Sequence, residues 1–293
     1  MWSNAHPALT FATIAIVGLA VPAGCRRVEA PPATSVVLAG VAKLPTDAAD
    51  PAWNAAPQYV AKLIPQDLVD PRLMEPSTAE LRVRAVSDGD QAAFRLQWTD
   101  ETTDDFPIPG RFADACAVQL PATARPTVPL PQMGEAGQPV AITFWSASLQ
   151  AIVDGRGDSL KDIYPNASID HYPFQASSLK PGSAEQEAMA ARYAPARALG
   201  NPMAGPRKTP VQDLIAEGPG TLGPAPSTDS DGRGGRTENG WAVVIRRPLP
   251  SGFAEQSHTQ VAFAVWQGSH DEVGARKMRT GWITLTQEIG KTP

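Results

Sequence analysis

Alternating apolar and polar residues mark the clearest strands of this chain. Residues 81–86 read Leu-Arg-Val-Arg-Ala-Val and residues 94–98 read Phe-Arg-Leu-Gln-Trp, so every second side chain is apolar. This period of two is typical of a strand with one face in a core and the other in water. Asp88 and Gly89 lie between the two segments and favour a tight turn. The pattern predicts an antiparallel hairpin.

A second strand-like segment lies near the carboxyl end. Residues 261–266 read Val-Ala-Phe-Ala-Val-Trp, which is typical of a strand buried on both faces. Gly268 opens a polar loop, and the chain returns through Lys277 to another predicted strand at 281–285. A lysine at the end of a buried hairpin is either solvated or directed into a pocket. The pattern leaves both interpretations open.

Other segments complete the predicted sheet. Short apolar runs predict further strands at 113–120, 140–145 and 241–247. The proline-rich segment 121–139 joins the first two of these strands as a loop. Residues 201–240 are dense in Gly, Pro, Ser and Asp, and we expect them to form a long surface excursion.

One convincing helix is predicted at 184–193. Ser183 and Gln186 have the spacing of a capping box, and the interior is rich in alanine. Many short strands with one or two short helices favour a mainly β fold. We therefore expect a single antiparallel β-sandwich domain over residues 37–293.

Composition supports this fold class and argues against one class of partner. The 293 residues include 30 prolines and 24 glycines, which is too many for a helical bundle. The formal net charge is -5 and the pI is about 5.4. These values argue against nucleic acid or an acidic membrane surface as the partner.

The first 25 residues have the features of an export signal. Residues 9–21 are apolar and too short to span a membrane comfortably. Small residues before Cys25 resemble a bacterial lipoprotein cleavage site, although Pro22 stands where leucine is usual. We expect a lipoprotein-type signal at 1–25, a tether at 26–36, and a periplasmic protein held at the membrane by lipid on Cys25. Plain secretion and an uncleaved anchor are the alternatives.

Cysteine and histidine usage excludes several kinds of site. With lipid on Cys25, Cys116 is the only cysteine left, so neither an intrachain disulfide nor a cysteine metal cluster is possible. There is no CxxCH haem attachment site, GxSxG, P-loop or GxGxxG motif, and the four histidines are too scattered to predict a metal triad. Taken alone, Met133 is interpreted as a core or loop residue and Lys277 as a surface lysine.

Several segments in a fixed order carry a resemblance to one known family. They are 94–102, 112–121, 132–134, Pro139-Val140 with Trp145, 164–173, 213–222, 240–246 and 262–277. Together they cover about residues 40–285. Their order and spacing resemble the haem-b-binding gamma subunits of ethylbenzene dehydrogenase, dimethylsulfide dehydrogenase, and chlorate and selenate reductases. These proteins belong to the type II DMSO reductase family.

The resemblance implies one non-covalent haem b per chain, with the iron held by a methionine and a lysine. The family's methionine falls on Met133 and its lysine on Lys277, while Lys208 competes for the lysine position. His270, in the loop leading to Lys277, is a further candidate for the second ligand. A lysine binds iron only as the free amine, and removing its proton at pH 7 costs about 4–5 kcal/mol at an ordinary pKa.

The resemblance also implies a role. With haem in place, we expect Trp266, Phe144 and Trp145 to form walls of the pocket. The chain would be a periplasmic b-type cytochrome subunit with no substrate chemistry of its own. It would carry electrons between the iron–sulfur subunit of a molybdenum oxidoreductase, which also has a catalytic subunit, and an external carrier. The alternative is a haem-free surface lipoprotein that binds carbohydrate or a protein partner.

Overall fold

The computed structural model describes residues 1–2, 33–106, 108–157, 159–168, 179–180, 182–193, 196, 199, 207–227 and 229–288. The predicted signal beyond its first two residues, including Cys25, lies outside these ranges. The chain divides into two compact units, Met1–Pro31 and Pro32–Pro293, and the fold given below is that of the second unit. Among the described helices, none combines the length and the apolar character that crossing a bilayer requires.

The described residues of the second unit contain fourteen strands. They are β1 (Val36–Gly40), β2 (Tyr59–Lys62), β3 (Ile64–Pro65), β4 (Glu80–Ser87), β5 (Gln91–Thr99), β6 (Ala115–Pro121), β7 (Val140–Ser146), β8 (Val211–Ala216), β9 (Gly223–Pro224), β10 (Asp231–Thr237), β11 (Gly240–Pro248), β12 (His258–Trp266), β13 (Met278–Arg279) and β14 (Ile283–Gln287).

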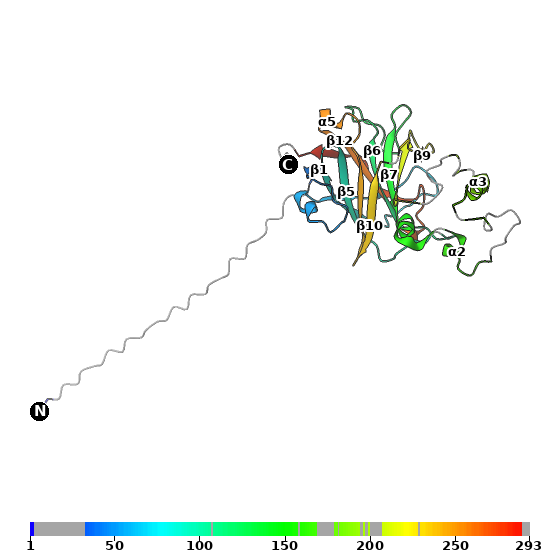
Figure 1. The fold of residues 1–293 in the computed structure, drawn as a ribbon. Helices are drawn as coiled ribbons and strands as arrows, with labels where there is room; N and C mark the ends of the chain where they lie inside the picture. Colours follow the sequence, from blue (N-terminus) through cyan, green and yellow to red (C-terminus); the bar gives the residue numbers. More distant parts are fainter. Residues whose placement is uncertain are drawn as a thin grey trace. The chain divides into compact units, whose positions relative to one another are not determined.

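The strands form two facing layers (Figure 1). The first layer runs β10-β11-β5-β4-β1, with β2 on β4, and the second runs β12-β6-β7-β8-β9, with β13 and β3 beside β12. β14 joins the layers because it pairs with β1 and with the first half of β12. The mainly β fold and the predicted sandwich are confirmed. The sheet is mixed in one place, since β1 runs parallel to both β4 and β14.

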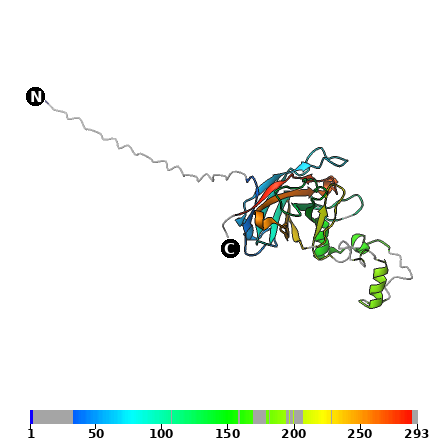
Figure 2. The same ribbon diagram turned by 90° about the horizontal axis from the view of Figure 1, so that it is seen from above.

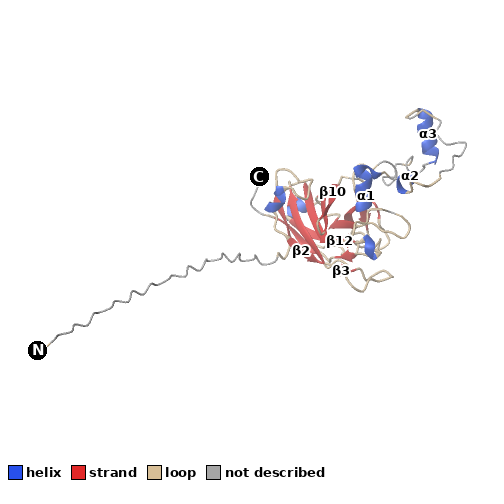
Figure 3. Cartoon of the chain, turned by 90° about the horizontal axis from the view of Figure 1, so that it is seen from below, coloured by secondary structure: helices blue, strands red, loops and turns tan. Residues whose placement is uncertain are grey.

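The helices of the described residues are short. They are η1 (Pro51–Ala55), α1 (Ala147–Ala151), η2 (Ile152–Arg156), α2 (Leu160–Ile163), α3 (Ala184–Tyr193), α5 (Phe253–Gln256) and η4 (Gly268–His270). Helix α3 has the predicted bounds, and the Ser183 hydroxyl accepts a hydrogen bond from the Gln186 backbone N–H at 3.2 Å. Helices α2 and α3 lie outside the two layers in every view (Figures 1, 2 and 3).

The core lies between the two layers and is rich in aromatic rings. Phe94 on β5 meets Phe263 on β12 edge to face, with 6.2 Å between ring centroids. Trp145 on β7 contacts both Trp98 and Trp241 of the opposite layer, at 6.4 Å and 5.2 Å. Aromatic contacts of this kind add to the burial of apolar area. They fix how the second layer sits on the first.

The prediction of a long excursion over residues 201–240 was wrong in part, because the segment contains β8 and β10. β10 pairs only with β11, at one edge of its layer, and carries three glycines among charged residues. One of these, Gly234, is required by packing, since a Cβ there would meet the Trp145 ring at 2.1 Å. The high glycine content predicted a loop, but at least one of these glycines is present because the strand lies close to a tryptophan ring.

Candidate functional site

The two faces of the second layer carry different side chains, because neighbouring residues on a strand point to opposite sides. On β7, Trp145 points inward to the core, so Phe144 points outward. On β12, Trp266 also points outward and meets Phe144 edge to face, with 5.4 Å between centroids and an interplanar angle of 81°. Two of the three predicted pocket walls therefore lie together.

An apolar cluster covers the outer side of this layer, and we call it the outer apolar face. Its buried members are Ala115, Ala117, Val140, Ile142, Ala216 and Trp266, and Met133, Phe144, Leu214, Ala264 and Trp282 pack against them. Four strands, β6, β7, β8 and β12, contribute to it. The second layer therefore packs apolar side chains on both of its sides.

Met133 lies in the loop between β6 and β7 and packs on the outer apolar face. Its φ angle is +67°, a left-handed conformation that is uncommon for a residue with a side chain. The Met133 carbonyl accepts a hydrogen bond from the Gly218 backbone N–H at 2.8 Å. Gly134, next in the chain, leaves no room for a Cβ beside the carbonyl oxygens of Gln138 and Ala216. Close contacts therefore fix the backbone at Met133, from which the side chain reaches the cluster.

Lys277 directly precedes β13 and is half-buried. Met278, the next residue, points into the core, so the Lys277 side chain is directed to the outer side. Its Nζ lies over the Trp266 ring, 5.4 Å from the centroid. The Lys277 carbonyl accepts a hydrogen bond from the Gln66 backbone N–H at 3.0 Å. Met133 and Lys277, which are 144 positions apart, thus meet the same apolar cluster.

The surroundings of Lys277 make its amine easier to deprotonate than the amine of an ordinary lysine. Burial lowers the pKa of Lys277 to about 8, and the positive charge of Arg279 acts in the same direction. At pH 7 the loss of the proton then costs about 1.4 kcal/mol, against roughly 4.6 kcal/mol for an ordinary lysine. This lysine is neither fully solvated nor paired with an acid in a described salt bridge.

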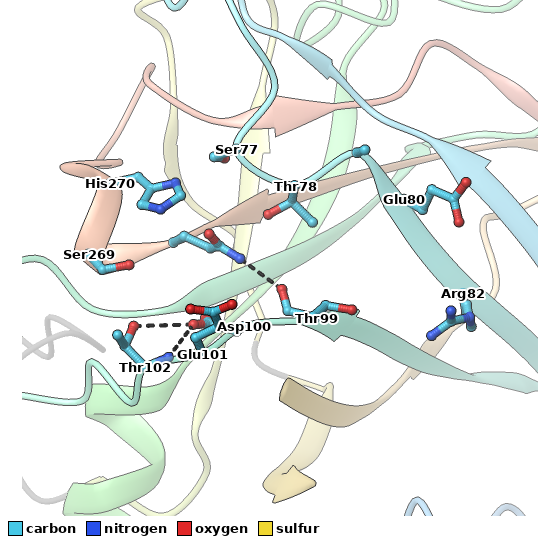
Figure 4. A pocket seen from close by; sticks show the side chains of 12 residues that line it. Ser77, Thr78, Glu80, Arg82, Thr99, Asp100, Glu101, Thr102, Ser269 and His270 are labelled. Atoms are coloured by element: carbon cyan, nitrogen blue, oxygen red, sulfur yellow. Dashed lines mark hydrogen bonds between the residues drawn. The ribbon is translucent and has the colours of Figure 1, made fainter. Parts of the chain in front are cut away.

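The other predicted site residues lie elsewhere. Trp145 does not belong with Phe144 and Trp266, because the strand alternation places it in the core on the opposite side of the layer. Lys208 is exposed in the segment before β8. His270 is exposed in η4 and lines a polar cavity at the ends of β4, β5 and β12 (Figure 4).

Three side-chain hydrogen bonds hold loops over the outer apolar face. Trp282 donates through Nε1 to the Pro129 carbonyl at 2.6 Å, and Gln119 donates through Nε2 to the Pro131 carbonyl at 2.9 Å. Trp266 donates through Nε1 to the Gly274 carbonyl at 3.0 Å. Sequence reasoning missed Trp282 and Gln119. Ala115 and Ala117 of β6 lie on the outer apolar face, and every second residue of a strand points to the same side. The same alternation therefore predicts that Gln119 points outward as well.

This donor set suits an iron porphyrin. A thioether is a neutral, soft ligand, and an amine becomes a ligand once it has lost its proton. Both groups border aromatic and aliphatic side chains, which suit the flat, apolar macrocycle. The chemistry of these two donors and of their apolar surroundings is therefore compatible with a haem.

The comparison with protein families decides which family this is. The sequence profile of the ethylbenzene dehydrogenase family matches residues 50–278 of this chain. The chain belongs to the ethylbenzene dehydrogenase family. The resemblance predicted from the ordered segments is thereby confirmed, and the matched range includes both Met133 and Lys277.

Two relatives match along most of their length. A Haloferax mediterranei protein that carries the name of a respiratory nitrate reductase heme subunit is 24% identical over 286 residues, covering 94% of this chain and 81% of the relative. The chlorate reductase subunit gamma of Ideonella dechloratans is 24% identical over 291 residues, covering 94% of each.

Among solved structures, a family 9 carbohydrate binding module from Caldicellulosiruptor kristjanssonii in complex with glucose aligns at a TM-score of 0.39 and 7% identity, covering 88% of this chain and 96% of the module.

Proposed function

We propose that this protein is a b-type cytochrome subunit of a molybdenum oxidoreductase complex. It binds one non-covalent haem b and passes electrons between the iron–sulfur subunit and an external carrier. Family membership and the names of the two relatives, a heme subunit and a gamma subunit, support this role. The substrate chemistry belongs to the catalytic subunit.

One observation carries the assignment of the ligands. The Lys277 amine, with a pKa lowered to about 8, and the Met133 thioether border the same outer apolar face. Met133 would donate a sulfur lone pair and Lys277 a nitrogen lone pair, and Phe144 and Trp266 would exclude water from the ring. If these two residues hold the iron, the chain would offer no open coordination site for a substrate. The bound haem supplies a one-electron couple, which is what an electron carrier requires.

The visible spectrum of the full chain, purified with haem supplied, tests this function. After reduction with dithionite we expect sharp α and β bands from six-coordinate iron. Met133→Ala should abolish these bands, because the thioether ligand is gone. Met74→Ala is the matched control, since Met74 is 84% exposed, and it should leave the spectrum unchanged. A folded but colourless protein would contradict the proposal and favour a haem-free binding module.

We also propose that the protein is exported and held at the periplasmic face of a membrane by lipid on Cys25. The apolar segment 9–21 and the small residues before Cys25 support this location. Mass spectrometry of the purified protein should find an amino terminus at a diacylglyceryl-modified Cys25. Cys25→Ser should yield a protein that keeps its signal and carries no lipid. An unmodified cysteine in the mature wild-type protein would rule out the lipid anchor.

A further inference from the structure

A polar cavity of about 600 Å³ lies where the start of β4, the end of β5 and the loop after β12 meet (Figure 4). Its walls are formed by segments 77–82, 99–102 and 267–270, which are far apart in the sequence. These walls carry hydroxyl, amide and carboxylate groups together with the Arg82 guanidinium and the His270 imidazole, beside a comparable area of apolar surface. A cavity of this size is in the range that binds small molecules or single side chains.

Two buried oxygen atoms of this cavity have no hydrogen-bond partner within the described residues. Asp100 is only 3% exposed, and its Oδ1 accepts from the backbone N–H and the hydroxyl of Thr102 at 3.0 and 3.2 Å, while Oδ2 accepts nothing. Thr78 is 4% exposed, and its Oγ1 is likewise unpaired. Such atoms cost about 1–3 kcal/mol each when they are left without a partner. Asp100 Oδ2 can only accept a hydrogen bond, whereas Thr78 Oγ1 can accept or donate one, so a ligand that donates hydrogen bonds could satisfy both atoms.

The Asp100 end of the cavity also carries negative charge that no described ion pair neutralises. Glu101 lies beside Asp100, and neither is in a described salt bridge (Figure 4). At the opposite end, Arg82 lies near Glu80, whose carboxylate is paired with Lys62. The charge of Asp100 also adds to the effect of burial that raises the pKa of Asp114 to about 6. The site therefore favours a positively charged ligand.

A guanidinium group meets these conditions better than a metal ion does. Among the described residues, no group of three or more His, Cys, Asp or Glu side chains could hold a metal ion. The cavity is also much larger than an ion needs. Arginine presents five N–H donors on a planar group and pairs well with a carboxylate and a hydroxyl at once. The unpaired oxygens of Asp100 and Thr78 are acceptors of this kind.

We propose that this cavity receives an arginine side chain of a protein partner, with the guanidinium donating to Asp100 Oδ2 and Thr78 Oγ1. The cavity wall at Gln267 is tied to the segment before β4, because Glu272 accepts from both the Gln267 N–H, at 2.8 Å, and the Ser77 hydroxyl. The same loop continues to Lys277. A partner anchored by arginine here therefore lies against the loop that bears the proposed iron ligand.

The identity of the partner as another subunit of the redox complex rests on the proposed function, whereas the arginine site rests on the cavity alone. The test uses the ¹⁵N-labelled full chain and N-acetyl-arginine amide as the probe. We expect saturable shifts of the Thr102 and Gly268 amide signals in the millimolar range. N-acetyl-citrulline amide, which has the same shape without the charge, should cause no saturable shift.

Two variants test the named oxygens. Asp100→Asn keeps the Oδ1 acceptor for Thr102 but places an N–H₂ donor at Oδ2, so the affinity for the probe should fall by about tenfold or more. Thr78→Val removes only the hydroxyl and should weaken binding by about threefold. Asp90→Asn is the matched control, because Asp90 is exposed and lies outside the cavity wall. It should bind the probe as the wild type does.

Three outcomes would overturn the inference. The first is equal response to the arginine and citrulline probes, and the second is full binding by a folded Asp100→Asn variant. The third is a response of Thr102 and Gly268 to calcium chloride, dependent on Asp100, with none to arginine. The reduced haem spectrum separates this test from the proposed function. If the probe does not bind but the haem bands are intact, only the arginine site is contradicted. If the probe binds to a protein that has no haem bands, only the haem proposal is contradicted.

Discussion

Replacing Lys277 with alanine is expected to weaken haem binding by about 100-fold and to abolish the six-coordinate spectrum. Loss of groups that merely support a metal ligand costs about 10- to 100-fold in affinity, so loss of a direct ligand should reach the upper end. The measurement is a haem titration of the full chain followed by visible absorption. Lys43→Ala is the matched control, because Lys43 is exposed on the surface, and it should bind haem as the wild type does.

The same experiment has an expected pH dependence. The pKa of Lys277 is lowered to about 8 by burial, and only the unprotonated amine binds iron. Below pH 8 one proton must leave for each haem bound, so the haem affinity should rise about tenfold per pH unit and level off above pH 8. In Lys277→Ala this slope should disappear. A slope that persists in the variant would show that a group other than Lys277 releases the proton.

The second large effect concerns stability. Trp145→Ala should lower the free energy of unfolding by about 3–5 kcal/mol, because truncating a buried aromatic residue leaves a cavity. The ring is fully buried, contacts Trp98 and Trp241, and donates through Nε1 to Gln150 Oε1 at 3.2 Å. Chemical denaturation of the full chain measures the loss.

Phe144→Ala is the natural comparison, since Phe144 is adjacent in sequence but points to the outer apolar face. This variant should lose much less stability, about 1–2 kcal/mol, because its ring is only partly buried. It should weaken haem binding instead, whereas folded Trp145→Ala should retain haem. Equal effects of the two substitutions on haem binding would contradict the assignment of the two faces.

Strand periodicity predicted much of the sheet. The alternation at 81–86 and 94–98 predicted β4 and β5, and the doubly apolar segment at 261–266 predicted the buried part of β12. β10 was missed, because an edge strand whose glycine faces a tryptophan has the composition of a loop. Its strand character depends on pairing with β11 across the short turn at Glu238 and Asn239.

The candidate site was predictable only in part. Alternation alone separates Phe144 from Trp145, so the expectation that both line one pocket conflicted with a rule already available from the sequence. By contrast, no local pattern brings Met133 to the same face as Lys277. That meeting depends on the left-handed conformation at Met133 and on the pairing of β13 with β12. The pairing of Met133 with Lys277 was therefore predicted from the family resemblance and not from the sequence pattern around either residue.

Lys277 is joined by a single peptide bond to Met278, which is fully buried in the core, and its own carbonyl is bonded to Gln66. The backbone of Lys277 is therefore fixed to the sandwich, and the flexible four-carbon side chain extends from that fixed point. If Lys277 holds the iron as proposed, no loop would have to become ordered on this side when haem binds. The entropy lost in placing this donor would then be limited to the rotamers of one lysine side chain.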